Sequence, residues 1–317
     1  MSLENLSVLV TGGAGFIGSH LVDALLARNC RVTVLDNLSS GNRANLAHVA
    51  DRISFIEGDI RNRELLTDLL AGVEVVFHQA AMVSVPQTVE QPIESAEVND
   101  MGTLFLLEAA RQAKVQRVVL ASSCAVYGDD PRLPKVETMS PKPQSPYAAQ
   151  KLMGEHYARL YHELYGLETV CLRYFNVFGP RQNPSSAYSG VISVFMTRAA
   201  VGDAPTIYGN GEQSRDFIFV GDVARANLQA ATTPAAAGKH FNIGTGRHIT
   251  VNRLWKTICQ LNPHSLQPHY VPARAGDIMA SEADISLARE TLEFEPSVSF
   301  EEGLKITFNW YMQATVP

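Results

Sequence analysis

Thr11-Gly-Gly-Ala-Gly-Phe-Ile-Gly18 is the stretch that decides the predicted fold. It follows an apolar run, Ser7–Thr11, that is typical of a buried strand, and it precedes a helical pattern that continues to about Arg28. A second strand pattern, Arg31–Leu35, comes next and ends at Asp36. The glycines fit both Gly-x-Gly-x-x-Gly and Gly-x-x-Gly-x-x-Gly, so backbone N–H groups can approach a pyrophosphate at the helix N-terminus. Strand, glycine turn, helix and strand in this order predict a dinucleotide-binding unit.

Asp36 indicates which dinucleotide binds. A carboxylate at the tip of the second strand can accept hydrogen bonds from the adenosine ribose, and it repels a 2′-phosphate. The sequence therefore predicts NAD rather than NADP as the cofactor.

Strand and helix patterns continue to alternate along the first 250 residues. Strands are expected at 53–56, 74–78, 117–122 and 169–173, and a helix is expected at 99–114. This alternation predicts an α/β protein with a Rossmann-like, doubly wound parallel sheet, whose ligands bind at the carboxyl ends of the strands.

Polar and small residues follow several of these strands. Asp59 could meet the adenine amino group, and Gln79–Ala81 is small enough to pass close to a cofactor. Ser122, Ser123 and Asn176 also lie at strand ends. We therefore expect these residues to face the same crevice as the glycine turn.

Tyr147 and Lys151 lie four residues apart on a predicted helix, with Ser145 as its N-cap, so they share a face. We expect the ammonium to lower the pKa of the phenol toward neutrality. Beside the strand-end Ser123, such a phenolate would be an acid/base group for a substrate hydroxyl. The same spacing also fits an ordinary amphipathic helix with a core tyrosine and a solvated lysine, and the dinucleotide pattern favours the catalytic interpretation.

The chain changes in character after Asn176. A helix is expected at 191–201, a turn-rich strand pair at 206–211, and a return to the first unit through the helix 220–232 and the strand 240–243. We therefore predict two interleaved domains: residues 1–175 with 217–248 bind NAD, and a smaller α/β domain of residues 176–216 with 249–317 binds the substrate.

Composition excludes several classes of function. The formal net charge of −6 argues against a nucleic-acid partner. The four cysteines lack metal-site spacing and the nine histidines form no metal motif, so no metal is expected, and His78 is expected to be structural. No membrane span or signal peptide is predicted, and the cysteine usage fits a reducing cytoplasm.

Taken together, the glycine turn, Asp36, Asp59, Ser123 and Tyr147-x-x-x-Lys151 resemble an extended short-chain dehydrogenase/reductase that acts on nucleotide sugars. Phe175-Asn-Val-Phe-Gly-Pro-Arg-Gln-Asn-Pro184, Arg215-Asp-Phe217 and Arg274-Ala-Gly-Asp277 extend the resemblance over nearly the whole chain. It is most similar to the UDP-hexose 4-epimerases, especially those that accept UDP-N-acetylglucosamine. Such enzymes use NAD, and the reaction passes through a transient 4-keto sugar.

The resemblance implies a role for each site residue. Tyr147 is implied as the base, Lys151 as its activator and nicotinamide-ribose ligand, and Ser123 as the partner of the sugar O4. The residues implied for cofactor binding are Gly12, Gly15, Phe16, Ile17, Gly18, Asp36, Asn37, Asp59, Ile60, Ala80, Ala81, Asn99, Ser122, Tyr147, Lys151 and Tyr174. Those implied for the UDP-sugar are Ser84, Ser123, Asn176, Gln182, Gly190, Val191, Tyr208, Arg215, Arg274, Asp277 and Ser281.

Within the substrate set, Asn176, Arg215 and Arg274 are implied as pyrophosphate ligands. Two arginines and an amide suit a dianion, since Arg offers bidentate donors. Asp277 is implied on the uridine ribose and Tyr208 against the uracil.

Ser281 bears on the choice of sugar. In the resemblance it flanks the C2 substituent, where glucose-restricted enzymes tend to have a bulky Tyr, so a serine leaves room for an acetamido group. Ser84, Gln182 and Gly190 fit the same pattern, whereas Val83 departs from it. Alternatives are a UDP-glucose 4-epimerase without N-acetyl preference and a UDP-uronic acid 4-epimerase.

Two further alternatives are weaker. Relatives that dehydrate or decarboxylate nucleotide sugars carry acidic residues where this chain has Cys124 and Ala125. A non-catalytic, NAD-binding regulatory protein would usually have lost Tyr147 or Lys151. The resemblance also implies a homodimer formed through the helices 99–114 and 147–164.

Overall fold

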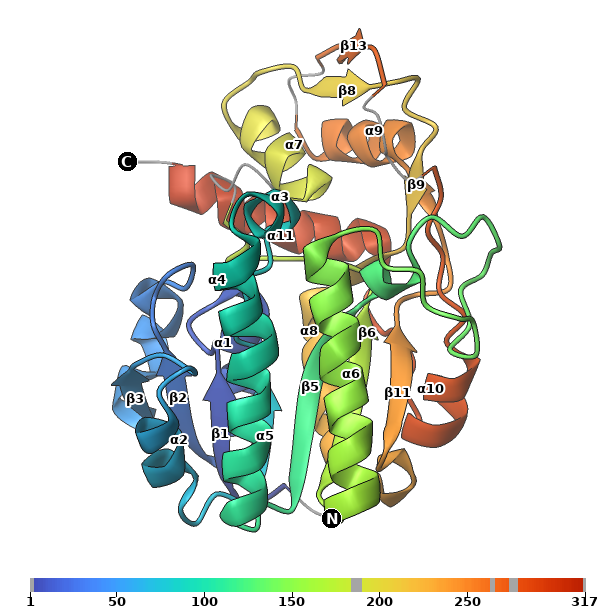
Figure 1. The fold of residues 1–317 in the computed structure, drawn as a ribbon. Helices are drawn as coiled ribbons and strands as arrows, with labels where there is room; N and C mark the ends of the chain where they lie inside the picture. The colour runs from blue at the N-terminus through green and yellow to red at the C-terminus, as the bar shows by residue number, and fades with distance from the viewer. Residues whose placement is uncertain (1–2, 184–189, 263–265, 274–278, 316–317) are drawn as a thin grey trace.

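The computed structural model describes residues 3–183, 190–262, 266–273 and 279–315. A central sheet with helices on both faces forms the lower part in Figure 1, and a smaller group of helices and short strands lies above the carboxyl ends of the sheet strands.

Seven parallel strands form the central sheet, in the order β11-β6-β5-β4-β1-β2-β3. The chain runs outward from β1 to β3 and then returns to place β4 on the other side of β1, so the strand order reverses between β1 and β4. Ligands of doubly wound sheets bind at such a reversal. The predicted fold class is confirmed. The strands are β1 Ser7–Thr11, β2 Arg31–Asp36, β3 Ile53–Glu57, β4 Val75–His78, β5 Arg117–Ser123, β6 Glu168–Tyr174 and β11 Lys239–Ile243.

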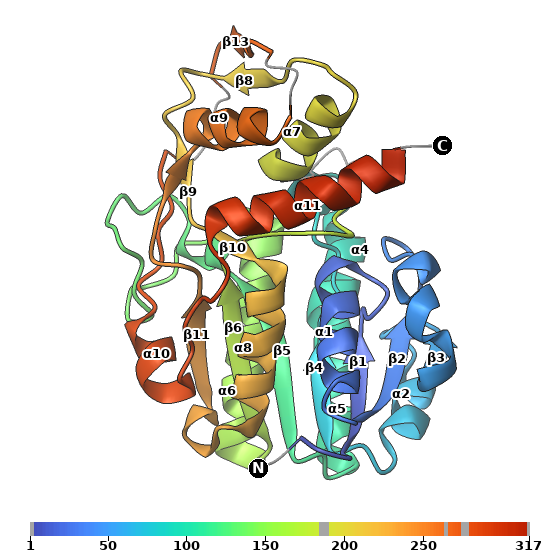
Figure 2. The ribbon, with the colours of Figure 1, turned by 180° about the vertical axis from the view of Figure 1, so that it is seen from behind.

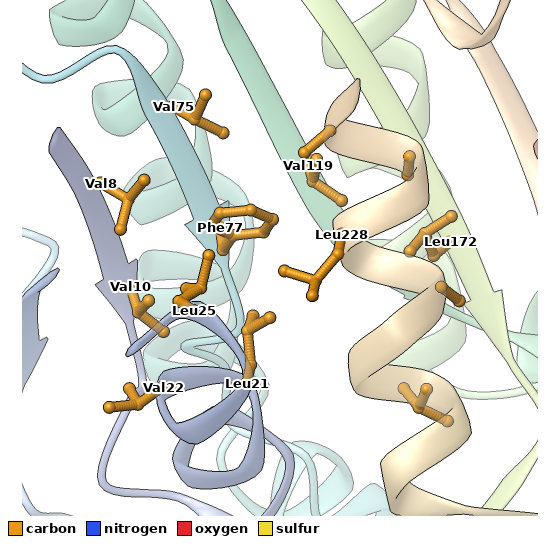
Figure 3. Packing of buried hydrophobic residues seen from close by; sticks show 14 of the residues in the cluster. Val8, Val10, Leu21, Val22, Leu25, Val75, Phe77, Val119, Leu172 and Leu228 are labelled. Atoms are coloured by element: carbon orange, nitrogen blue, oxygen red, sulfur yellow. The ribbon is translucent and has the colours of Figure 1, made fainter. Parts of the chain in front are cut away.

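Helices cover both faces of this sheet because side chains alternate along each strand. Val8 and Val10 of β1 pack on the face covered by α1 and α8, whereas Leu9 packs on the face covered by α2, α5 and α6. Figure 2 shows α1 and α8 side by side on the first face, and Figure 3 shows Leu21 and Leu25 of α1 against Val10 and Phe77. The helices are α1 Phe16–Leu26, α2 Arg63–Leu70, α5 Thr103–Gln112, α6 Pro146–Tyr165 and α8 Val220–Thr232.

Local sequence fixes both ends of α6. The Ser145 hydroxyl accepts a hydrogen bond from the Ala148 N–H at 3.2 Å, and Pro146 occupies the first helical position, as predicted. Gly166 ends the helix with φ of 71°, a left-handed conformation that glycine adopts without strain.

The upper part has its own apolar core, in which Phe195 and Trp255 meet edge to face. The prediction of a strand pair within 206–211 is wrong: β8 pairs in parallel with β13, and β9 pairs with β12. Gly209 and Gly211, both with positive φ, lie in the loop that carries the chain from β8 to β9. The elements are α7 Val191–Ala200, α9 Val251–Leu261, α11 Phe300–Thr315, β8 Thr206–Tyr208, β9 Ser214–Arg215, β12 Ile249–Thr250 and β13 His269–Val271.

Several segments connect the two parts. β7 and β10 pair with each other above the sheet, and α10 packs with the first core through Ala288 and Leu292, although it lies within 249–317. The predicted domain boundaries stay a prediction. The remaining elements are β7 Asn176–Phe178, β10 Phe217–Phe219, α10 Ser286–Leu292, α3 Val85–Glu90, α4 Pro92–Ala96, η1 Arg43–Arg52, η2 Glu97–Gly102, η3 Cys124–Tyr127 and η4 Pro234–Ala236.

Side chains cover both outer strands of the central sheet. Glu137 accepts a hydrogen bond from the Asn242 N–H of β11 at 2.8 Å. At the opposite edge, Arg43 of η1 lies 4.5 Å from the Phe55 ring centroid and forms an ion pair with Glu57. Among the helices in the described part of the chain, none is long and apolar enough to cross a membrane.

Candidate active site

The glycine turn joins β1 to α1 and has the geometry of a dinucleotide cradle. Gly12 has φ of 70°, and a Cβ there would lie 2.6 Å from the Ala80 nitrogen. A Cβ on Gly18 would lie 2.1 Å from the Gly12 carbonyl oxygen, so only glycine allows α1 to start this close to the strand. Gly15 is the N-cap of α1, and no side chain caps that helix. Phe16 and Ile17 form its first turn, whose N–H groups can bind a phosphate.

Asp36 lies at the end of β2, next to the turn. Its carboxylate accepts hydrogen bonds from the Ala14 N–H at 2.9 Å and the Leu38 N–H at 2.8 Å, and burial raises its pKa. Each oxygen keeps a second lone pair for a ribose hydroxyl. Asp36 therefore holds the glycine turn in addition to its predicted cofactor contact.

Asn37 and Asp59 lie together at the ends of β2 and β3. Asn37 donates to Asp59 at 2.9 Å, and Arg61 binds the same carboxylate through two N–H groups. The hydrogen bonds from Arg61 lower the pKa of Asp59 to about 2. Asp59 is therefore a fixed anion beside the predicted adenine position, and Ile60 next to it is buried against Gly102.

A buried chain of hydrogen bonds holds the loop after β4. The Ala80 N–H donates to Thr11 Oγ1 at 3.3 Å, and Thr11 Oγ1 bonds His78 Nδ1 at 2.7 Å. His78 Nε2 lies 3.0 Å from Thr103 Oγ1, which donates to the Asn99 carbonyl. Nε2 must therefore carry the proton. Burial lowers the pKa of His78 to about 3, so the imidazole is neutral and structural, as predicted.

Asn99 continues this support. Its side chain accepts from the Met82 N–H at 2.8 Å, donates to the Met82 carbonyl at 3.0 Å, and donates to Gln150 of α6 at 2.7 Å. Tyr174, at the end of β6, bonds Gln79 and Asn227 through its hydroxyl. Both residues were predicted to bind the cofactor, and both fix the loop 79–82 through their side chains.

Ser123, Tyr147 and Lys151 lie together at the end of β5 and the start of α6. Lys151 Nζ donates to the Ala121 carbonyl at 2.9 Å and lies 5.8 Å from the Tyr147 ring centroid. The prediction that Lys151 lowers the pKa of Tyr147 is wrong for this structure. Burial raises the Tyr147 pKa to about 12, which a hydrogen bond with Ser123 only partly offsets. Burial also lowers the pKa of Lys151 to about 8.

A pocket at the ends of β4 and β5 brings predicted residues together with some that sequence reasoning missed. The predicted residues that line it are Ala80, Ala81, Asn99, Ser122 and Lys151. Gln150, Glu155 and Cys171 also line it. The end of the crevice nearest the acid/base group is thus formed by β4, β5, β6 and α6.

Glu155 is the most consequential of the missed residues. It follows Lys151 by four positions and lies on the same face of α6. Its carboxylate accepts from Ser122 Oγ at 2.5 Å and from Arg173 at 2.8 and 2.7 Å. Arg173 also donates to the Tyr127 hydroxyl at 2.9 Å. The signal was present in the helical spacing of Tyr147, Lys151 and Glu155, but their partner Arg173 lies on another strand.

On the substrate side, Asn176 starts β7 and its N–H donates to the Asp216 carbonyl at 3.0 Å. Arg215 follows Ser214 on β9, and its guanidinium donates to the Ser214 carbonyl at 2.9 Å. The Ser281 N–H donates to the same carbonyl at 3.1 Å. Arg215 and Ser281 are therefore neighbours across one short backbone pairing.

The other predicted substrate residues occupy element ends. The Ser84 hydroxyl caps α3 by accepting from the Gln87 N–H at 3.2 Å. Gly190 is the N-cap of α7 without a side-chain cap, Val191 is its first residue, and Tyr208 ends β8. Gln182 bonds the Val177 carbonyl at 3.3 Å. Arg274 and Asp277 lie outside the described residues. Across those described, no three His, Cys, Asp or Glu side chains gather to hold a metal.

A glycine cradle at the reversal of a doubly wound sheet, next to a Ser–Tyr–Lys group, defines a dinucleotide-dependent enzyme of the short-chain dehydrogenase/reductase class. Known proteins agree with this class. The model of the NAD dependent epimerase/dehydratase family matches residues 8–244. The UDP-glucose 4-epimerase of Mycolicibacterium smegmatis is 42% identical over 308 residues, which cover 96% of this chain and 97% of that protein.

Two solved structures are similar over 98% of the chain. A UDP-N-acetylglucosamine 4-epimerase from Methanobrevibacter ruminantium M1, in complex with UDP-N-acetylmuramic acid, is 41% identical with a TM-score of 0.95 and is covered over its full length. A UDP-glucose 4-epimerase from Thermus thermophilus, in complex with NAD, is 39% identical with a TM-score of 0.88, also covered fully. The chain belongs to the NAD dependent epimerase/dehydratase family. It is a nucleotide-sugar 4-epimerase of the extended short-chain dehydrogenase/reductase type and uses NAD.

Proposed function

We propose that the enzyme interconverts UDP-N-acetylglucosamine and UDP-N-acetylgalactosamine, and more slowly UDP-glucose and UDP-galactose. The observation that carries this preference is Ser281, a small, half-buried residue that pairs through its backbone with the strand of Arg215. A small side chain at this position leaves space for an acetamido group. The similarity to the Methanobrevibacter ruminantium enzyme supports the same substrate class.

Tyr147 is the proposed proton acceptor and donor at the sugar O4. When bound, NAD accepts the C4 hydride and returns it to the other face of the transient 4-keto sugar. At its raised pKa of about 12 the phenol holds its proton at neutral pH, so it needs positive charge nearby to ionise. Ser123 hydrogen-bonds the phenol and the sugar hydroxyl, and Lys151 orients the nicotinamide ribose.

The rest of the cofactor is held by the glycine turn and by the ends of β2 and β3. The open N-terminus of α1 binds the pyrophosphate, since its N–H groups have no side-chain cap. Asp36 binds the adenosine ribose, and Asp59 with Asn37 lies beside the adenine. The loop fixed by Thr11 and His78 passes close to the nicotinamide end.

The UDP moiety is proposed to bind between β9 and the start of α7. Arg215 supplies charge to the pyrophosphate, and the uncapped N-terminus at Gly190 adds N–H donors. Asn176 completes this group, and Tyr208 is proposed to pack against the uracil. Arg274 and Asp277 are proposed to bind the pyrophosphate and the uridine ribose.

A UDP-glucose 4-epimerase without N-acetyl preference is the second candidate, and the similarity to the Mycolicibacterium smegmatis enzyme favours it. To distinguish the two, the purified protein is incubated separately with four UDP-hexoses, and the C4 epimers are followed by NMR. We expect kcat/KM to be about tenfold higher for the acetylated pair, in the range that pocket fit supplies. Equal values for both pairs would support the second candidate.

We also propose a cytoplasmic homodimer. Met153, Leu160 and Leu164 of α6 are 41%, 37% and 66% exposed and recur at helical spacing, so they form an apolar stripe that a second copy can cover. All four cysteines are free thiols, as in a reducing compartment. Light scattering on the wild type and on Leu164→Glu tests the interface, and the variant is expected to be monomeric.

A further inference from the structure

Asp216 has a carboxylate that neither the motif pattern nor the proposed chemistry uses. Its side chain is 0% exposed and lies between Arg215 and Phe217 at the start of β10. Oδ1 accepts from the Thr245 N–H at 2.8 Å and from the Thr245 hydroxyl at 2.7 Å. Oδ2 accepts from the Gly246 N–H at 2.9 Å and from the Ala283 N–H at 3.1 Å. One buried carboxylate therefore joins three segments that are far apart in the sequence.

Two of these segments carry predicted substrate residues. Ser214 donates from its N–H to the Met279 carbonyl at 2.9 Å and accepts from the Ser281 N–H at 3.1 Å. Two residues later, Ala283 reaches the Asp216 carboxylate. The backbone carbonyl of Asp216 also accepts from the Asn176 N–H. The environment of Asp216 thus includes the neighbours of Arg215, Ser281 and Asn176.

The opposite side of the same segment contacts the catalytic loop. Lys135, between Ser123 and Tyr147 in the sequence, donates from its N–H to the Glu282 carbonyl at 2.8 Å, and its own carbonyl accepts from the Asp284 N–H at 2.8 Å. Residues 279–284 therefore lie between β9 and the loop that precedes Tyr147. Moving them would change the position of the sugar relative to the acid/base group.

The packing leaves little freedom at this point. A Cβ on Gly244 would lie 2.9 Å from Asp216 Oδ2 and 2.7 Å from the Ala283 Cβ. The backbone therefore approaches the carboxylate closely. An amide in place of the carboxylate would turn an NH2 group toward two of the four donors, whichever way it is oriented.

We propose that Asp216 is a positioning residue for nucleotide-sugar binding, because its carboxylate fixes residues 279–283 against β9 and so sets the distance between Arg215 and Ser281. This inference rests on the proposed substrate roles of Arg215 and Ser281. Asp216 itself is not a ligand, and its effect is therefore expected in substrate affinity and not in NAD binding.

Asp222 provides a matched control on the same chain. It is 1% exposed, and it accepts from the Ser297 N–H at 3.1 Å, the Ser297 hydroxyl at 2.9 Å and the Val298 N–H at 3.2 Å. It therefore resembles Asp216 in burial and donors, but it fastens α8 to the segment before α11. None of these partners is a predicted site residue.

The test compares Asp216→Asn, Asp222→Asn and the wild type by calorimetric titration with UDP, by NAD content, and by KM and kcat. We expect Asp216→Asn to bind UDP about tenfold more weakly and to raise KM by a similar factor, because an amide opposes donors that bonded a charge. NAD content should be unchanged. Asp222→Asn should lower Tm and leave UDP affinity unchanged. Unchanged UDP affinity in Asp216→Asn, or equal losses in both variants, would overturn the inference.

Thr245→Val is the milder variant if Asp216→Asn does not fold. It removes one donor to Oδ1 and leaves the backbone bonds in place, so we expect about threefold weaker UDP binding. An unchanged affinity in this variant would refute the inference. A wild-type protein that did not bind UDP would instead refute the proposed function, so the two failures are distinguishable.

Discussion

The cofactor side and the substrate side of the crevice use the same chemical device, but they distribute it differently. On the cofactor side, Asp36, Thr11 and Asn99 each accept a backbone N–H from one loop, those of Ala14, Ala80 and Met82. On the substrate side, Asp216 alone accepts from two separate loops. The first arrangement divides the anchoring among three polar groups, so each loop depends on its own anchor. The second concentrates it, so one substitution should move several substrate contacts together.

The largest effect should come from the group between the two sides. Tyr147→Phe removes the proton acceptor and should lower kcat by about 10²–10⁴-fold, the usual contribution of a positioned acid or base. Binding of NAD and of UDP, measured separately, should stay within about twofold because both sides keep their anchors. Near-normal turnover in this variant would contradict the assigned role of Tyr147.

The next effect sharpens the cofactor side through pH. Burial lowers the pKa of His78 from 6.5 to about 3, so below pH 6.5 the unfolded chain binds a proton that the folded protein does not. The free energy of unfolding should therefore fall as pH decreases from about 6.5 toward 3, by at most about 5 kcal/mol from this group. Denaturant titrations at several pH values measure this slope.

His78→Gln should flatten that slope, because the titrating group is gone. His156→Gln, which alters an exposed residue of α6, is the control and should leave the slope as in the wild type. If both variants kept the wild-type slope, the neutral, buried state assigned to His78 would be wrong.

On the substrate side, Ser281→Tyr should lower kcat/KM for the acetylated sugars by roughly 10–100-fold and affect the non-acetylated pair much less, because a ring would occupy the acetamido space. The steady-state constants for all four UDP-hexoses measure this selectivity. Equal losses on both pairs would show that Ser281 supports the site without selecting the sugar.

The smallest effect concerns Asp36. Asp36→Ala removes the repulsion of a 2′-phosphate, so NADP should bind about tenfold better relative to NAD. Because the Ala14 and Leu38 N–H groups also lose their acceptor, NAD itself should bind more weakly. Asp36→Asn, which keeps an acceptor, separates the two contributions in a titration with each dinucleotide. NADP copurifying with the wild type would contradict the assignment.

The two sides also differ in how far the sequence predicts them. The glycine turn and Asp36 form a contiguous motif whose geometry follows from local rules, and the structure has that geometry. Asp216 and Glu155 could not be predicted in the same way, because their partners lie on other segments. The pKa of Tyr147 was predicted wrongly for a related reason. Helical spacing places Lys151 on the same face, but it does not show that Nζ turns to the Ala121 carbonyl or how deeply the phenol is buried.

Glu137 at the outer strand β11 has a consequence for the molecule in a crowded solution. A free strand edge is a template on which another chain can add a strand and start aggregation. The Glu137 carboxylate occupies the Asn242 N–H that such a strand would need, and at the opposite edge η1 places the charged Arg43 over Phe55. Self-association by strand addition is therefore disfavoured at both edges, which leaves the helical faces for any controlled assembly.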